Sequence, residues 1–133
     1  MKKIFIDTNF FLRFLLKDIQ KQHLQTKKLL LEGAERKIDL FTSLIVIFEL
    51  YWVLTSFYQK NKKKVVKIIL DILKLKFIEL EEREILLRAL EIYSISNLDL
   101  EDSYNLVYAL TKKANKIATF DKKLEKAFEK KII

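Results

Sequence analysis

The sequence predicts an α/β protein, a three-layer α/β/α sandwich with a short, mainly parallel central sheet. Short apolar runs that suit buried strands alternate with longer stretches of helical periodicity, the pattern of a parallel sheet covered by helices. Two of these runs stop at a carboxylate, Asp7 and Asp121, as strands do at the ligand-binding edge of such a sheet. With 133 residues, 50% of them hydrophobic, the chain suits one domain with a sizeable core. We therefore predict a single domain over residues 1–133.

The first half of the chain is predicted to form two strands and three helices. In chain order these are Lys3–Ile6, Phe10–Leu16, Asp18–Gly33, Ile38–Thr42 and Leu44–Phe57. The first strand is a short apolar run that meets a polar turn. The second helix is expected to have Asp18 as its N-cap and Gly33 as its C-cap. Its inner side is expected to carry Leu24, Leu29, Leu30 and Leu31. The third helix is apolar almost all round, which indicates a buried central helix.

The second half is predicted to contain mostly helices. Asn61 is the expected N-cap of a helix with valines and isoleucines inward and lysines outward. Asp99, or a residue near it, is expected to open a helix that runs to about Asn115. Ile117–Phe120 has the pattern of a strand. The remaining predicted elements are a strand at Phe77–Ile78, helices at Glu82–Ser94 and Leu124–Phe128, and an edge strand at Ile132–Ile133.

Composition excludes several chemistries. Without cysteine, the chain has no disulfide, zinc–thiolate site, iron–sulfur cluster or thiol nucleophile. His23 is the only histidine and lies in a polar stretch, so we place it on the surface and exclude a Ser-His-Asp arrangement. One glycine is too few for a phosphate-binding loop. The N-terminus does not resemble a signal peptide, and the longest apolar run is far shorter than the roughly 20 residues that span a bilayer. We therefore expect a cytoplasmic protein with no membrane association.

The chain is basic. It has 26 Lys and Arg against 18 Asp and Glu, a net charge of +8. Such an excess favours polyanionic partners, because each neutralised phosphate releases counterions. A general lysine bias of the composition explains the same charge, so charge alone leaves nucleic-acid binding open. The run Lys60–Lys67 likewise fits either a solvated helix face or a docking surface.

Glu49 is the most informative residue of the sequence. It lies within the apolar run from Leu44 to Leu54, so we expect its carboxylate to be buried. A buried carboxylate needs a cation, a hydrogen-bonding network or a proton. The structural alternative is a salt bridge to a core arginine or lysine.

Other carboxylates are expected to lie near Glu49. Asp7 and Asp121 both follow predicted strands. Asn9 is the better-placed cap for the first helix, which leaves Asp7 free, whereas Asp121 also suits the role of a helix cap. Asp99 and Asp102 together approximate a capping box. We expect Asp7, Glu49, Asp102 and Asp121 to converge on one edge of the sheet, where a hard divalent cation can neutralise them.

These segments together resemble the PIN-domain nucleases, and among them the VapC-like toxins of toxin–antitoxin pairs. The resemblance lies in four motifs in the family's order, and it runs from residue 3 to about 125. They are Ile4-Phe5-Ile6-Asp7-Thr8-Asn9, Phe48-Glu49-Leu50-Tyr51-Trp52-Val53-Leu54, Asp99-Leu100-Glu101-Asp102-Ser103 and Thr119-Phe120-Asp121. The third motif departs from the family pattern, because Ser103 stands where alanine is frequent.

The resemblance implies a catalytic cluster of Asp7, Glu49, Asp102 and Asp121 that holds one or two Mg²⁺ or Mn²⁺ ions. Asn9, Thr119 and Thr8 are then polar helpers, and Asp99 competes with Asp102 for the third position. It further implies metal-dependent hydrolysis of RNA phosphodiester bonds, a homodimer and a cognate antitoxin.

Three competing functions stay open at this point. A phosphatase with an aspartate nucleophile is disfavoured, because Asn9 stands where its second acid belongs. A non-catalytic, basic RNA-binding module of the same fold has no use for Glu49 in an acidic cleft. A housekeeping RNA-processing nuclease of the same fold has the same residues as a toxin, so the sequence does not separate the two.

Overall fold

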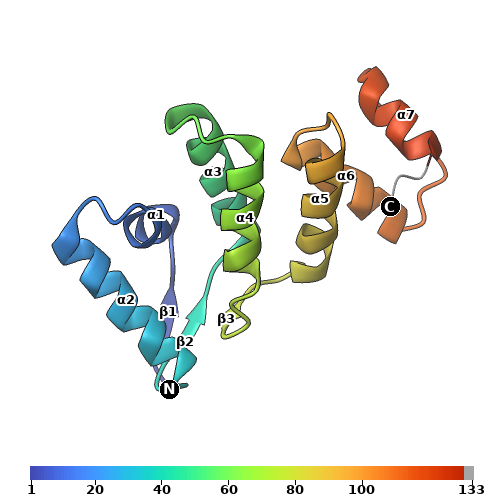
Figure 1. The fold of residues 1–133 in the computed structure, drawn as a ribbon. Coiled ribbons are helices and arrows are strands. Elements are labelled where there is room, and N and C mark those ends of the chain that lie inside the picture. Colours follow the sequence, from blue (N-terminus) through green and yellow to red (C-terminus); the bar gives the residue numbers. More distant parts are fainter. Residues whose placement is uncertain (131–133) are drawn as a thin grey trace. The chain divides into compact units, whose positions relative to one another are not determined.

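The structure is a computed structural model that describes residues 1–130 (Figure 1). The chain divides into two compact units. The first unit consists of Met1–Lys60 and Lys74–Glu81, and the second of Asn61–Leu73 together with the chain from Glu82 onward. The predicted edge strand at Ile132–Ile133 lies outside the described residues.

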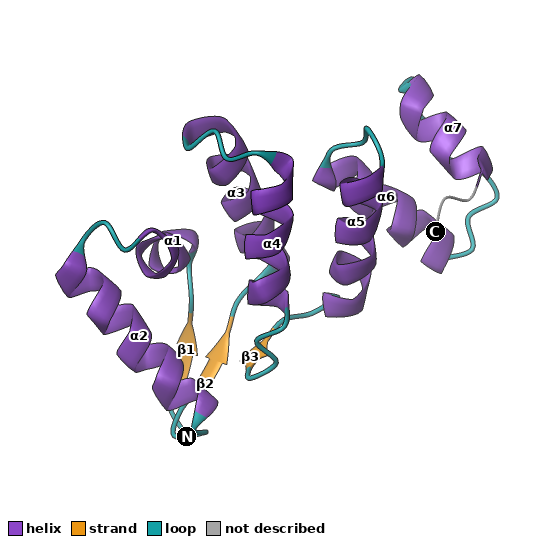
Figure 2. Ribbon diagram, viewed as in Figure 1, coloured by secondary structure: helices purple, strands orange, loops and turns teal. Residues whose placement is uncertain are grey.

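A parallel sheet of three short strands organises the first unit (Figure 2). Its order is β1-β2-β3, and its strands are β1 (Lys3–Phe5), β2 (Asp39–Phe41) and β3 (Ile78–Glu79). In the central strand, Leu40 is paired with Ile4 on one side and Ile78 on the other. The predicted α/β class with a short parallel sheet is confirmed.

Helices of the first unit bury their apolar sides around this sheet. They are α1 (Thr8–Leu16), α2 (Gln20–Ala34), α3 (Leu44–Trp52) and the π-helix η1 (Val53–Phe57). Phe11, Ile47 and Leu50 are fully buried, and together with Ile6 and Leu40 they form the centre of the core. Burying such side chains is the main favourable term in folding.

The predicted ends of the second helix are wrong. Asp18 does not cap α2, because its carboxylate accepts hydrogen bonds from the Arg13 guanidinium at 2.9 and 3.0 Å, and the helix begins two residues later. Gly33 does not end α2 either, since the helix continues to Ala34 and the left-handed residue that follows is Arg36. Gly33 is instead required by close packing. A Cβ atom there would lie 2.3 Å from Cδ1 of Leu40.

The sides of α2 also differ from expectation. Leu30 is buried, but Leu24 and Leu31 are 54% and 56% exposed. His23, predicted on the surface, is only partly exposed and stacks on Phe14 of α1 with ring centroids 5.6 Å apart. The face of α2 that packs on α1 therefore runs through His23 rather than through all four leucines.

The segment predicted as one buried helix is two elements. The α-helical hydrogen bonding of α3 gives way to the wider π pattern of η1, in which the Tyr58 N–H donates to the Val53 carbonyl. Nor is this segment buried all round. Ile45 is 65% and Trp52 59% exposed. The run has more apolar residues than the core of the first unit covers, so one side remains open to solvent.

The second unit is helical. Its helices are α4 (Lys62–Leu73), α5 (Arg83–Ile95), α6 (Leu100–Thr111) and α7 (Lys122–Lys130). α5 contacts both α4 and α6, and α7 packs against α6 (Figure 1). Asn61 caps α4 as predicted, since its side-chain oxygen accepts from the Lys64 N–H at 2.9 Å. Val65, Leu86 and Leu106 are buried in the centre of this unit.

Two predictions for the second unit are wrong. The helix after Asp99 ends at Thr111 rather than near Asn115, because Lys113 adopts a left-handed conformation with φ 60° that turns the chain. Ile117–Phe120 forms no strand. A strand needs a neighbour to pair its backbone groups, and all three strands of the sheet belong to the first unit.

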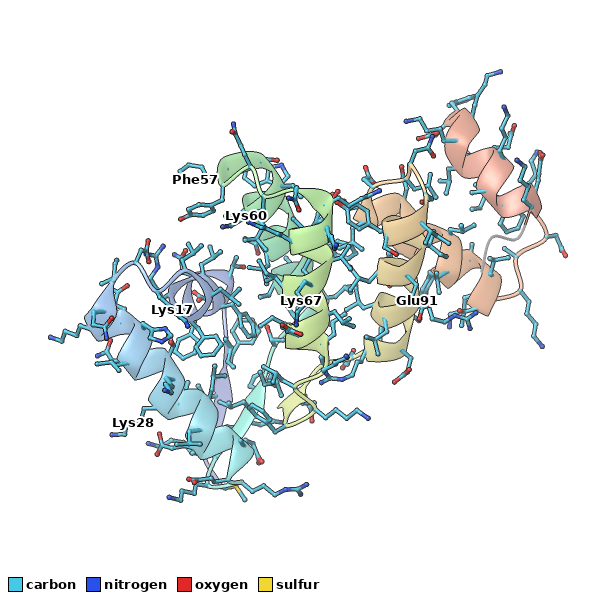
Figure 3. The ribbon with its side chains drawn as sticks, viewed as in Figure 1. Lys17, Lys28, Phe57, Lys60, Lys67 and Glu91 are labelled. Carbon is cyan, nitrogen blue, oxygen red and sulfur yellow. The ribbon has the colours of Figure 1, made fainter. Side chains whose placement is uncertain are left out.

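Lysine side chains are spread over both units. Lys17 follows α1 and Lys28 lies on α2, while Lys67 lies on α4 (Figure 3). All three are exposed, and Lys67 forms an ion pair with Asp71 at 2.9 Å. The run Lys60–Lys67 thus includes a neutralised lysine on a solvated helix face.

Candidate active site

Asp7 lies directly after β1 and caps α1. The preceding residue, Ile6, still donates its N–H to Phe41 of the sheet at 2.9 Å, and Asp7 then turns the chain into the helix. Its Oδ1 accepts from the Phe10 N–H at 3.0 Å. The prediction that Asn9 caps this helix is therefore wrong, since Asn9 is already inside it. Asp7 is exposed, and Oδ2 is the oxygen that this cap leaves unused.

Glu49 lies on the open side of α3. Ser43 begins this helix as its N-cap, accepting from the Val46 N–H at 3.3 Å. Val46, Ile47 and Leu50 face the core, whereas Glu49 is exposed. The expectation of a buried Glu49 is wrong for the same reason that Ile45 and Trp52 are exposed, namely that one side of α3 has no cover.

Asp7 and Glu49 line the same pocket. Its volume is about 450 Å³. Its polar lining consists of Asp7, Thr8, Asn9, Ser43 and Glu49, and its apolar lining of Phe5, Leu12, Ile45, Val46 and Val53. The fold of the first unit thus brings together the acids of the first two motifs, with Thr8 and Asn9 beside them.

Sequence reasoning missed Ser43 as a pocket residue. The sequence does contain a signal for Ser43, because a serine directly before an apolar helical run is a typical N-cap. As the N-cap of the helix that follows β2, it lies near the carboxyl end of that strand. The apolar lining was also missed. In the sequence those side chains cannot be told apart from core residues.

The three other acids lie in the second unit, at the starts of its last two helices. Asp99 caps α6, accepting from the Asp102 N–H at 2.8 Å, as predicted. Asp121 caps α7, accepting from the N–H groups of Lys123 and Leu124 at 2.9 and 3.2 Å. Thr119 supports this turn, since its hydroxyl accepts from the Asp121 N–H at 3.0 Å. Ser103, fully buried, donates its hydroxyl to the Asp99 carbonyl at 2.8 Å.

The negative charges of this group act on one another. Partial burial raises the pKa of Asp102, and the neighbouring charges of Asp99 and Asp121 raise it further. Burial also raises the pKa of Glu101, with the charges of Asp99 and Asp102 adding to the effect. Only Lys123 opposes the shift at Asp102. Like charges at this spacing disfavour ionisation of both partners, and a nearby positive charge offsets the effect.

No ion pair within residues 1–130 involves Asp7, Glu49, Asp99, Asp102 or Asp121. No three acidic or histidine side chains of the described chain lie close enough together to hold a metal ion. In the first unit Asp7 and Glu49 line one pocket, and in the second the charges of Asp99 and Asp121 act on Asp102.

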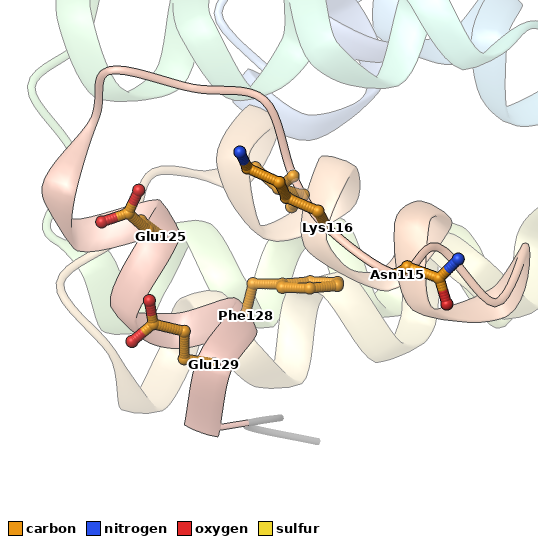
Figure 4. Close-up of a pocket in the computed structure, with 6 residues that line it drawn as sticks. Asn115, Lys116, Glu125, Phe128 and Glu129 are labelled. Atoms are coloured by element: carbon orange, nitrogen blue, oxygen red, sulfur yellow. The ribbon is translucent and has the colours of Figure 1, made fainter.

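A second pocket lies within the second unit. It has a volume of about 340 Å³ and lies between the segment after α6 and helix α7, with the Phe128 ring beside Asn115 and Lys116 (Figure 4). Glu125 and Glu129 complete its charged lining. It includes none of the predicted site residues.

Most of the chain matches one known protein family. The model of the PIN domain matches residues 4–129, which takes in segments of both units. The chain belongs to the PIN domain family. No curated protein and no solved structure matches it. PIN domains are generally nucleases, a class of hydrolase, and they act on nucleic acid and typically use divalent metals. In the part of this PIN domain that the structure describes, no helix is long and apolar enough to span a bilayer.

Replacing Asp102 with asparagine is expected to stabilise the metal-free protein. Folding raises the pKa of Asp102, so the ionised carboxyl lowers the free energy of unfolding. This loss of stability is fully present above the folded-state pKa and disappears as the pH falls through it. D102N therefore raises the melting temperature in EDTA at about pH 7, and the gain shrinks towards about pH 4. The carboxyl is largely solvated, so we expect a gain of no more than about 0.5 kcal/mol.

The matched control is E91Q on α5, an exposed glutamate (Figure 3) whose replacement is expected to leave the melting temperature unchanged. A D102N variant less stable than the parent at both pH values contradicts this account.

Proposed function

We propose that this PIN domain is an Mg²⁺- or Mn²⁺-dependent endoribonuclease, with Asp7, Glu49, Asp102 and Asp121 as carboxylate ligands of the metal. The observation that carries the proposal is the shared pocket of Asp7 and Glu49 in a chain of a nuclease family. Burial raises the pKa of Asp102 and the charges of Asp99 and Asp121 raise it further, which supports the same role for the second pair of acids.

When bound by these carboxylates, a divalent metal would lower the pKa of water and stabilise charge on the phosphate oxygens. The protein's part is to hold the ligands in place. Asp7 and Asp121 are fixed by the helix ends that they cap, each through Oδ1. Thr8 and Asn9 line the pocket with Asp7, Thr119 accepts from the Asp121 N–H, and Asp99 accepts from the Asp102 N–H, which supports a role for all four as polar groups beside the ligands.

Cleavage of a mixed pool of labelled RNAs tests this function. The purified protein is assayed with Mg²⁺, Mn²⁺ or EDTA, and metal-dependent cutting is the expected result. Salt-sensitive RNA binding without cutting contradicts the nuclease and favours a binding module. Cutting that continues in EDTA contradicts the metal site.

Metal binding has a second readout that does not require the right RNA. A ligand that binds only the folded state raises stability, by about 2.7 kcal/mol at a concentration one hundred times its Kd. We expect Mn²⁺ to raise the melting temperature of the parent protein and to raise that of a D7N/E49Q double variant much less. Equal shifts in the two proteins place the metal elsewhere.

We also propose the biological setting that the motifs imply: the toxin of a toxin–antitoxin pair, acting in the cytoplasm as a homodimer of single PIN domains. The family match through both units supports one domain over residues 1–133. Sedimentation at tens of micromolar tests the dimer, and a strict monomer contradicts it. Growth arrest on expression, absent in E49Q, is expected of a toxin, whereas normal growth favours a housekeeping nuclease.

A further inference from the structure

We propose that Trp52 stacks on an unpaired base of the RNA substrate and holds the strand beside the acidic pocket. The inference rests on the proposed nuclease function and adds a positioning residue to it. Four steps support it: the place of Trp52 on α3, its exposure, the backbone that supports it, and the chemistry of RNA.

Trp52 lies on the same side of α3 as the pocket. It follows Glu49 by three residues and Ile45 by seven, and residues at these spacings are neighbours on a helix surface. Both Glu49 and Ile45 line the pocket, as does Val53, which follows Trp52. Trp52 does not itself line the pocket, but its spacing from Glu49 and Ile45 makes it their neighbour on the helix surface, next to a pocket that contains Asp7 and Glu49.

The indole is also exposed, so a planar group can approach it. Its residue is 59% exposed, and Ile45 on the same side is 65% exposed. Phe57, at the end of η1, is exposed as well (Figure 3), but its ring packs edge-on against Tyr58 with centroids 5.1 Å apart. Trp52 is thus the exposed aromatic residue nearest in sequence to Glu49.

The backbone at Trp52 is held in place. The Thr55 hydroxyl donates to the carbonyls of Tyr51 and Trp52, at 2.9 and 3.2 Å. Trp52 is the last α-helical residue before the π-helix η1, and such interruptions are frequent at functional sites. Its neighbours Leu50 and Tyr51 are buried and fix the helix beneath it.

An exposed aromatic ring beside a phosphodiester-cleaving site suits single-stranded RNA. Bases of single strands and loops can unstack and lie on an aromatic side chain, and stacking accepts any base. In a duplex the base faces are already stacked on each other. Trp52 therefore favours an unpaired nucleotide near the bond to be cut, while other contacts determine which base it is.

Intrinsic fluorescence provides a direct test, because Trp52 is the only tryptophan of the chain. The parent protein is titrated in EDTA with a short single-stranded RNA, the same RNA annealed to its complement, and an abasic strand of equal length. We expect quenching by the single strand alone. The proposal is overturned if the emission stays unchanged while an independent anisotropy measurement shows that the single strand is bound. It is also overturned if the abasic strand quenches the emission equally.

Variants separate stacking from simple apolar contact. W52L is expected to weaken binding of the single strand roughly tenfold, and W52F to retain most of the affinity. L31A, which shortens an exposed leucine on α2, is the control and is expected to bind as the parent does. A W52L variant with unchanged affinity overturns the proposal. The proposal is also overturned if the emission changes with protein concentration and not with RNA, because Trp52 then contacts a second copy of the chain.

The outcomes also distinguish this proposal from the nuclease function. Quenching that persists in E49Q, which no longer cuts, supports both. Metal-dependent cutting without quenching leaves the nuclease and removes the role of Trp52. If the protein neither binds nor cuts any RNA of the pool, the nuclease function itself is contradicted.

Discussion

Glu49→Gln is expected to lower metal-dependent RNA cleavage by more than about 100-fold, because even groups that only support a metal ligand are worth 10–100-fold. The glutamine keeps the size of the side chain and removes its charge. Glu49 is exposed and forms no ion pair within residues 1–130, so the melting temperature in EDTA is expected to remain that of the parent.

Asp7 allows the same loss to be separated from folding. Asn caps helices as well as Asp does, so D7N keeps the bond to the Phe10 N–H and removes only the charge. D7A removes both, at a further cost of about 1 kcal/mol in stability. Activity assays and melting curves are compared across D7N, D7A and E49Q, with E91Q as an exposed control outside the pocket. Full cleavage by D7N or E49Q shows that the site has been assigned to the wrong residues.

Gly33→Ala is expected to destabilise the protein by about 1–3 kcal/mol, the usual cost of inserting a methyl group into a packed core. The new Cβ would lie 2.3 Å from Cδ1 and 2.9 Å from Cγ of Leu40. Leu40 is 2% exposed in the central strand, so it has no room to retreat. In an ordinary helix the same change gains about 1 kcal/mol, and the clash is expected to outweigh that gain.

A double-mutant cycle checks the cause. Leu40→Ala is destabilising in itself, but in that background G33A meets no obstacle and its effect is expected to change sign. Urea unfolding of the four proteins measures the coupling. If G33A stabilises the parent protein, α2 is not held against β2 as the structure describes.

The regular parts of the fold could be predicted from the sequence because local patterns determine them. Alternation of short apolar runs with helical stretches predicts a parallel sheet, which the first unit contains, and the residues around Asn61 and Asp99 predict the helix caps that both form. Strand formation at Ile117–Phe120 depends on a neighbouring strand, which no local pattern reports. The role of Gly33 depends on the approach of Leu40, which is equally remote in the sequence.

The candidate site shows the same division. The sequence predicts one cluster of Asp7, Glu49, Asp102 and Asp121. Asp7 and Glu49 share a pocket of the first unit, whereas Asp102 and Asp121 belong to the second unit. The predicted burial of Glu49 is nevertheless wrong, because its side chain is exposed. Its apolar neighbours in the sequence are partly exposed, because side chains that alternate around a helix are not all covered by one core. Burial of a helix side is a property of its partners rather than of its own composition.

The helix caps of the aspartates have a consequence for how occupancy of the site can be observed. Asp7 and Asp121 each hold the first turn of a helix through a single carboxylate oxygen. Any cation that binds such a carboxylate also immobilises the group that accepts from the amides of Phe10, Lys123 and Leu124. Amide hydrogen exchange at these three positions therefore serves as a local gauge of occupancy, since fraying of a helix end requires its cap to open. Slower exchange at the start of α1 and of α7 on addition of Mn²⁺ would register loading of each aspartate separately, without any substrate.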